Sequence, residues 1–167
     1  MAKHIAIPLL ISTTRIAALP IFLIFFSQQN IIFCLILLGF CAFTDFLDGY
    51  LARRFQVTSR FGAYFDALAD FILMFGIYTI FYSNGDYPIW LLLLLVTSFL
   101  LFLITSRFTK KIYDPVGRYL GSALYIGIIL TLIFPTQASF NFVEYAFLVF
   151  FLISLASRII SLSRKQH

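Results

Sequence analysis

The sequence has 167 residues, of which 62% are hydrophobic and only 11% are charged. Soluble domains contain about 45–50% apolar and about 25% charged residues, so this composition excludes an ordinary soluble domain and indicates a chain in a lipid bilayer. The length suffices for a single domain, 1–167. The net charge of +5 needs no nucleic-acid partner, because attraction to anionic lipid headgroups accounts for it.

Six apolar runs follow one another along the chain, separated by short polar breaks. A membrane-crossing helix requires about 20 mostly apolar residues, and the runs are close to this length. The sequences Ser83-Asn-Gly-Asp86 and Pro135-Thr-Gln137 between them are typical of turns. We therefore predict an all-α integral membrane protein with six transmembrane helices, near residues 8–26, 31–51, 61–82, 88–106, 119–135 and 141–162.

Lysine and arginine are distributed unevenly over the predicted loops. The two chain ends and the loops after the second and fourth helices hold most of them, whereas the other three loops contain none. Basic residues remain on the cytoplasmic side of a membrane, so we expect both termini to be cytoplasmic. The small size and the lack of a recognisable targeting segment favour a prokaryotic plasma membrane.

Four aspartates lie within 26 positions of the sequence. Asp45 and Asp48 lie near the cytoplasmic end of the second predicted helix, and Asp66 and Asp70 lie near the cytoplasmic start of the third. At about 100° per residue, each pair occupies one face of its helix. Two helices joined by a short loop pack antiparallel, so the sequence predicts that the four carboxylates face one another.

Carboxylates at this depth need a compensating charge. Each Asp at a helix centre costs about 2.5–3.5 kcal/mol on insertion scales, and repulsion among four of them adds to that cost. Two divalent cations would neutralise them, and a ligand set of oxygens alone favours Mg²⁺, Mn²⁺ or Ca²⁺ over zinc. Gly49 and Gly62 lie on the same helix faces and leave room for a ligand to approach the backbone. The cluster therefore predicts a metal site that also binds phosphate.

The pattern Asp-x-x-Asp-Gly-x-x-Ala-Arg, eight residues, Gly-x-x-x-Asp-x-x-x-Asp runs from Asp45 to Asp70. It resembles the signature of the CDP-alcohol phosphatidyltransferases, with every signature position filled at the correct spacing. The resemblance implies the six-helix fold of that family over the whole chain and a homodimer. It also implies a phospholipid biosynthesis enzyme that transfers a phosphatidyl or archaetidyl group from a CDP-linked lipid to an alcohol and releases CMP. Its active site would face the cytoplasm.

The resemblance also implies roles for the four aspartates. Asp45, Asp48 and Asp66 would be the main ligands of two Mg²⁺ or Mn²⁺ ions that bind the diphosphate. Asp70 would contact one of these ions and act as the general base that takes the proton of the acceptor hydroxyl. A carboxylate beside an attacking hydroxyl is chemically suited to that role.

Further positions match the part of the family that binds the CDP-lipid. Gly49, Ala52 and Arg53, together with Gly62, would form part of the cradle for the cytidine diphosphate. Many members read Pro-Asn-x-x-Thr-x-x-Arg in the first helix, where this chain reads Pro8-Leu-Leu-Ile-Ser-Thr-Thr-Arg15. The hydroxyl is kept by Ser12 and the arginine is retained, whereas a leucine replaces the asparagine. A hydroxyl bonded to the helix backbone is the alternative interpretation of Ser12.

Arg107 and Arg118 flank the second basic loop and lie at helix ends. The planar fork of arginine matches phosphate oxygens, so both are candidates to bind a phosphorylated acceptor such as glycerol 3-phosphate or inositol phosphate. Charge that only sets the topology is the alternative for this loop. An unphosphorylated acceptor (serine or a phospholipid headgroup), a divalent-cation transporter and a non-catalytic lipid-binding scaffold also stay open.

Gly117 and Gly121 form a small-xxx-small pattern at the start of the fifth predicted helix. In membrane helices such a pattern permits close approach of two backbones. We expect close packing within the protein at this position, with a dimer contact as the alternative.

Overall fold

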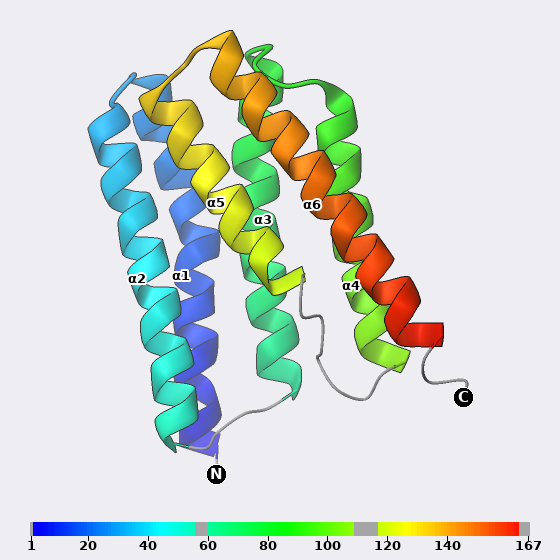
Figure 1. The fold of residues 1–167 in the computed structure, drawn as a ribbon. Helices are drawn as coiled ribbons and strands as arrows, with labels where there is room; N and C mark the ends of the chain where they lie inside the picture. Colours follow the sequence, from blue (N-terminus) through cyan, green and yellow to red (C-terminus); the bar gives the residue numbers. More distant parts are fainter. Residues whose placement is uncertain (1, 56–59, 109–116, 164–167) are drawn as a thin grey trace. The chain divides into compact units, whose positions relative to one another are not determined.

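The computed structural model describes residues 2–55, 60–108 and 117–163 (Figure 1). Every element within these ranges is a helix, which confirms the predicted all-α class and the predicted order of six helices. The helices extend up to six residues beyond the predicted apolar runs, because backbone hydrogen bonds continue into the polar flanks. Their bounds are α1 Ala2–Ser27, α2 Ile31–Phe55, α3 Arg60–Ser83, α4 Ile89–Phe108, α5 Gly117–Ile133 and α6 Gln137–Ser163.

Two segments of the described chain are long and apolar enough to cross a membrane. They are Tyr64–Ser83 within α3 and Gln137–Ser157 within α6, while the apolar parts of the other helices are shorter. Many large hydrophobic side chains are exposed, among them Ile32 and Phe142, and large exposed apolar surface marks contact with a membrane or a partner. The fold is thus that of an apolar all-helical membrane protein, and the six crossings and the cytoplasmic termini stay predictions.

Two short helix connections, one of them the predicted turn at Ser83–Asp86, contain a residue with positive φ. Gln29 has φ of 57° and Gly85 has φ of 85°, the left-handed conformation that commonly ends a helix. The amide of Phe33 donates to the side-chain oxygen of Asn30, with an N–O distance of 3.5 Å, where asparagine caps the start of α2. These local features end α1 and α3 and let the chain turn into α2 and α4.

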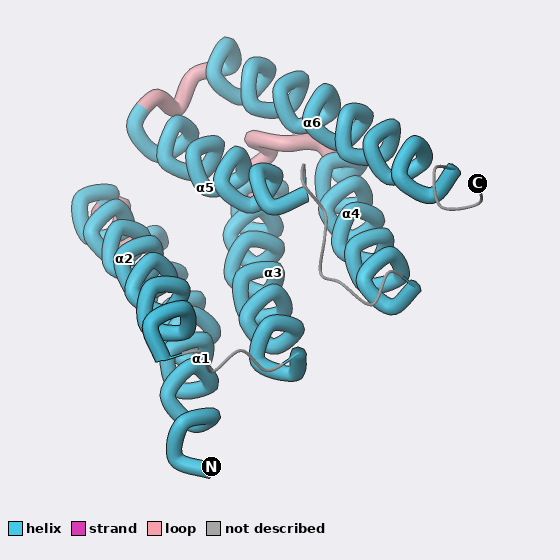
Figure 2. Tube along the Cα trace, turned by 60° about the horizontal axis from the view of Figure 1, so that its bottom comes forward, coloured by secondary structure: helices cyan, strands magenta, loops and turns pink. Residues whose placement is uncertain are grey.

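The described helices fall into two compact units that divide within α3, between Ile77 and Tyr78. The organisation of the chain as a single domain stays a prediction. In the first unit, α1 and α2 lie side by side (Figures 1 and 2). Their shared core includes Phe22, Cys34 and Leu38, which are almost completely buried.

Helix α3 approaches α1 closely at Gly76. A Cβ atom built on Gly76 would lie 2.5 Å from the Cδ2 atom of Leu19, so only a residue without a side chain fits there without moving Leu19. Leu19 lies one helical turn after Arg15. The close contact therefore holds the middle of α1 against the helix that carries Asp66 and Asp70.

In the second unit, α5 and α4 both pack against α6 (Figure 2). Its core contains Tyr78, Tyr87 and Thr131, all buried. The Tyr87 hydroxyl and the Thr131 hydroxyl are hydrogen-bonded at 2.6 Å, and the Tyr78 hydroxyl donates to the carbonyl of Leu124 at 3.1 Å. Polar groups in this apolar core are thus paired with one another or with the helix backbone, as burial demands.

Within this unit, no described residue packs closely on Gly121; the surroundings of Gly117 lie outside the described part, and a dimer contact at this pattern stays a prediction. No described atom lies within 4 Å of a Cβ atom built on Gly121, whereas one built on Gly127 would lie 2.6 Å from the Tyr78 hydroxyl oxygen. The close packing of α5 therefore occurs about two turns further along the helix. The spacing of Gly117 and Gly121 shows only that two small residues lie about one turn apart. It does not show which face of α5 packs against a neighbouring helix.

Candidate metal and active site

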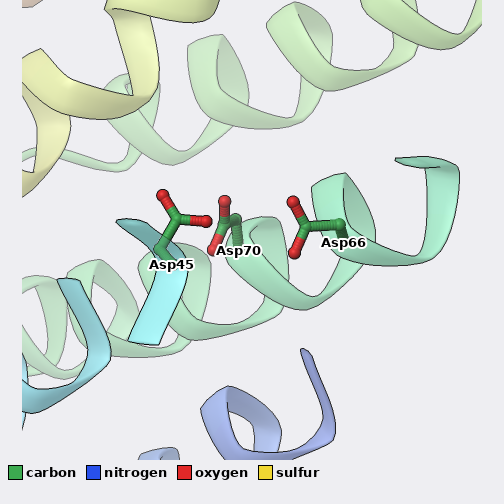
Figure 3. A group of neighbouring side chains, drawn as sticks. All are labelled: Asp45, Asp66 and Asp70. Atoms are coloured by element: carbon green, nitrogen blue, oxygen red, sulfur yellow. The ribbon is translucent and has the colours of Figure 1, made fainter. Parts of the chain in front are cut away.

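Three of the four predicted aspartates meet in the first unit. Asp45 comes from α2, and Asp66 and Asp70 come from successive turns of α3 (Figure 3). Each offers a carboxylate oxygen, and these three oxygens all lie within 4.8 Å of one another. The side chain of Asp48 lies outside the described part of the structure, so its place in the cluster stays a prediction.

Helix geometry and exposure explain how these carboxylates form an accessible cluster. Asp66 and Asp70 are four residues apart, a spacing that places both on one face of α3. The side chains of Asp45, Asp66 and Asp70 are 53%, 39% and 46% exposed. A ligand can therefore reach all three carboxylates from outside α2 and α3. A fully buried structural ion pair would not be accessible to a ligand.

Arg15 of α1 lies against the same three carboxylates. Its Nη1 atom donates to Oδ1 of Asp66 at 2.9 Å and to Oδ1 of Asp70 at 2.5 Å. Its Nη2 atom donates to Oδ1 of Asp45 at 2.5 Å. The arginine itself is only 1% exposed, so its guanidinium forms the inner wall of the cluster and the carboxylates form the outer one.

The charges and donor atoms of this cluster fit a divalent cation. Three ionised carboxylates and one guanidinium leave a net charge of −2, which one Mg²⁺ or Mn²⁺ would balance. The donor set consists of oxygens alone, as these ions prefer. At Mg–O distances of about 2.1 Å, opposite ligands are about 4.2 Å apart. Carboxylate oxygens within 4.8 Å of one another need only small rotations to reach that spacing.

The other predicted site residues are described only in part. Gly62 lies in the first turn of α3, one turn before Asp66, as the sequence predicts. The side chains of the remaining candidates lie outside the described part of the structure, and their roles stay predictions. These candidates are Ser12, Gly49, Ala52, Arg53, Arg107 and Arg118.

Arg15 is the residue of this site whose position the sequence did not reveal. The first-helix motif included it, but only as a retained family position with no assigned contact. A charged residue inside an apolar helix is costly and usually faces the protein interior or a charged partner. The acidic side chains predicted at a similar depth were those of the four aspartates. The rule that a charged residue in an apolar helix faces a charged partner could therefore have predicted the contact of Arg15 with them.

The family model described as CDP-alcohol phosphatidyltransferase matches residues 5–160. Several curated relatives carry the name CDP-diacylglycerol--glycerol-3-phosphate 3-phosphatidyltransferase. The protein of Aquifex aeolicus is 34% identical over 113 residues, which are 63% of this chain and 64% of that protein.

Two further relatives with the same name match a shorter stretch. The protein of Pectobacterium atrosepticum is 38% identical over 71 residues, and that of Yersinia enterocolitica is 37% identical over 71 residues. Each match covers 41% of this chain and 39% of the relative. The matched stretches thus span less than two thirds of these relatives' lengths. No solved structure matches the chain with significance.

The family match covers nearly the whole chain, including all four aspartates and Arg15. The signature spacing from Asp45 to Asp70 and the convergence of three of its carboxylates agree with that match. This chain belongs to the CDP-alcohol phosphatidyltransferase family.

Proposed function

We propose that this protein transfers a phosphatidyl group from CDP-diacylglycerol to glycerol 3-phosphate and releases CMP. The observation that carries the proposal is the convergence of Asp45, Asp66 and Asp70 within 4.8 Å, at the spacing of the family signature. The acceptor is suggested by the curated relatives, which are named for glycerol 3-phosphate. This acceptor is one of the two phosphorylated alcohols that the basic loop predicted.

Two divalent ions, Mg²⁺ or Mn²⁺, would be held by the carboxylates of Asp45, Asp48, Asp66 and Asp70. Bound there, they would supply positive charge against the diphosphate and the CMP leaving group. Two ions and one guanidinium carry five positive charges, and four carboxylates carry four negative ones. The filled site would then be slightly positive, which suits it to a diphosphate.

Side chains of the protein would carry out the proton transfer that the reaction requires. Asp70 would take the proton of the acceptor hydroxyl as its oxygen bonds to the lipid-linked phosphorus, and the bond from that phosphorus to CMP would break. Oδ1 of Asp70 accepts a hydrogen bond from Arg15, so the second carboxylate oxygen of Asp70 would be the base. General base assistance contributes about 10²–10⁴-fold to such reactions.

Binding of the two substrates would involve side chains on either side of the aspartates. Ser12, Gly49, Ala52, Arg53 and Gly62 would contact the CDP-lipid, where the glycines let a diphosphate approach the helix backbone. The acceptor phosphate would be bound by arginine forks, for which Arg107 and Arg118 are the candidates. We further infer a homodimer in a prokaryotic plasma membrane, with the aspartates open to the cytoplasm.

Release of CMP by the reconstituted protein tests this function. The purified full chain in lipid vesicles with Mg²⁺, CDP-diacylglycerol and glycerol 3-phosphate should release CMP and form a lipid phosphate product in equal amounts. Omission of the acceptor or addition of EDTA should stop the release. Inositol phosphate and serine, offered in place of glycerol 3-phosphate, should give much lower rates.

The outcomes separate the competing functions. Faster release with serine or inositol phosphate would replace the acceptor and keep the reaction class. A transporter would move Mg²⁺ or Mn²⁺ into sealed vesicles without releasing CMP. A scaffold would bind the CDP-lipid with no turnover, so either result would refute the proposed transferase.

A further inference from the structure

Arg15 places one guanidinium against three carboxylates that come from two other stretches of helix. We propose that Arg15 is the internal counter-ion of the aspartate cluster. The guanidinium and a divalent cation would together neutralise the same three carboxylates. The inference rests on the proposed metal site. It adds that Arg15 is the positioning residue that holds the three carboxylates together.

The geometry of the contacts favours this role. The two terminal nitrogens of Arg15 each reach a different helix, with Nη1 on Asp66 and Asp70 of α3 and Nη2 on Asp45 of α2. A guanidinium holds its donors in a rigid planar fork, whereas the ammonium of lysine is a compact point charge. A single arginine can therefore fix the spacing of all three carboxylates, and a lysine at the same position cannot.

Burial shows what holds the guanidinium in place. Arg15 is 1% exposed, and its Nε atom has no hydrogen-bond partner among the described residues. A buried cation is costly unless it is paired. The contacts that offset this cost are those with Asp45, Asp66 and Asp70, so the guanidinium takes its position from the cluster and stabilises the cluster in return.

The charges also indicate why both counter-ions are needed. Arg15 neutralises one of three negative charges and leaves −2, enough to attract a divalent ion. Without Arg15 the cluster would carry −3, and repulsion between its carboxylates would be relieved only by metal. Each carboxylate bonds Arg15 through Oδ1 and has a second oxygen, so metal binding does not require the guanidinium to leave.

A distinct behaviour follows for the metal-free protein. The wild-type fold should tolerate removal of divalent ions, because Arg15 remains to pair the carboxylates. A variant without the guanidinium should depend on divalent ions for its stability. Stabilisation by metal should therefore be larger when Arg15 is absent, the opposite of what loss of an ordinary scaffold residue would cause.

Thermal unfolding of the full chain in detergent, measured in EDTA and in MgCl₂ or MnCl₂, tests the inference. Removal of one partner of a buried ion pair costs enough to lower the Tm of a chain of this size by about 6–20 °C. We expect a drop in this range for Arg15→Met in EDTA and recovery of most of it with Mg²⁺ or Mn²⁺. Arg15→Lys should lie between wild type and Arg15→Met, because it keeps the charge and loses the fork.

A second substitution supplies the matched control. Asp45→Asn in the Arg15→Met background removes one of the repelling charges, so it should restore part of the Tm in EDTA and reduce the shift caused by metal. If Arg15→Met does not fold under either condition, Arg15→Lys decides. Its metal-induced shift should exceed that of wild type, and an equal or smaller shift would overturn the inference.

The result is separable from the proposed function. Equal Tm losses for Arg15→Met in EDTA and in Mg²⁺ would show that the arginine only fills space, even if the wild-type protein releases CMP. Absence of CMP release by the wild-type protein would refute the transferase. It would leave the coupling between Arg15 and the metal to be judged by the unfolding data alone.

Discussion

Substitution of Gly127 by alanine should destabilise the second unit. A Cβ atom at this position would lie 2.6 Å from the hydroxyl oxygen of Tyr78 and 2.9 Å from Cγ1 of Val143. Tyr78 is fully buried, and its ring packs edge-on against Phe81 and Tyr87. Because Tyr78 and Val143 are both buried, we expect the helices to shift or the Tyr78 hydroxyl to leave the Leu124 carbonyl.

The expected cost combines three terms. Overpacking in a well-packed core costs about 1–3 kcal/mol, and loss of the Tyr78 hydrogen bond adds about 0.5–1.5 kcal/mol. Alanine is a better helix former than glycine by about 1 kcal/mol, which offsets part of this. The net effect should be a loss of about 1–3 kcal/mol, equivalent to a Tm decrease of about 2–12 °C for a chain of this length.

Gly121→Ala provides the control on the same helix. No described atom lies within 4 Å of the added Cβ there, so only the gain in helix propensity remains. Thermal unfolding of both variants beside wild type in one detergent would measure the difference. A Gly127→Ala protein as stable as wild type, or a Gly121→Ala protein equally destabilised, would refute the packing described for α5.

Three further predictions concern chemistry and pH. Asp70→Asn should lower the rate of CMP release by at least about 10²-fold while Mg²⁺ still raises the Tm; normal turnover would rule out the base. Arg118→Ala should raise the KM for glycerol 3-phosphate far more than that for the CDP-lipid, and equal effects on the two would defeat the acceptor-phosphate role. Burial raises the pKa of Tyr87, in the loop between α3 and α4, from its ordinary value of 10.0 to about 12. The unfolded chain loses this proton near pH 10 and the folded chain near 12, so Tyr87 should make the free energy of unfolding fall as the pH rises through this window. Denaturant titrations from pH 9 to about 12 should show a steeper fall for wild type than for Tyr87→Phe.

The sequence was sufficient for the features that depend on local order. Apolar runs and turn residues predicted six helices in their correct order, because helix formation and turn geometry are set by neighbours in the chain. The same helical periodicity placed Asp66 and Asp70 on one face of α3. The unbroken signature from Asp45 to Asp70 further indicated the family, which the match over residues 5–160 shows.

Helix ends and close contacts between helices were harder to predict from the sequence. Hydropathy marks the part of a helix that suits lipid, so it gave no signal for the residues of α1 before position 8. A glycine shows that close approach is possible, but the neighbour on another helix decides whether it occurs. Within the second unit, the described residues make such a close approach at Gly127 and not at Gly121.

The sequence by itself determined which charged groups lie within the apolar helices, and the tertiary structure decided which of them meet. Asp45, Asp66 and Asp70 belong to one signature, and the shared face of Asp66 and Asp70 on α3 can be deduced from their spacing alone. Arg15 lies 30 residues before Asp45 along the chain, and only the packing of α1 against α2 and α3 brings its guanidinium to the carboxylates. The energy of an ion pair depends on the distance between its charges in space. The residue pattern within one helix does not determine that distance to a residue on another helix.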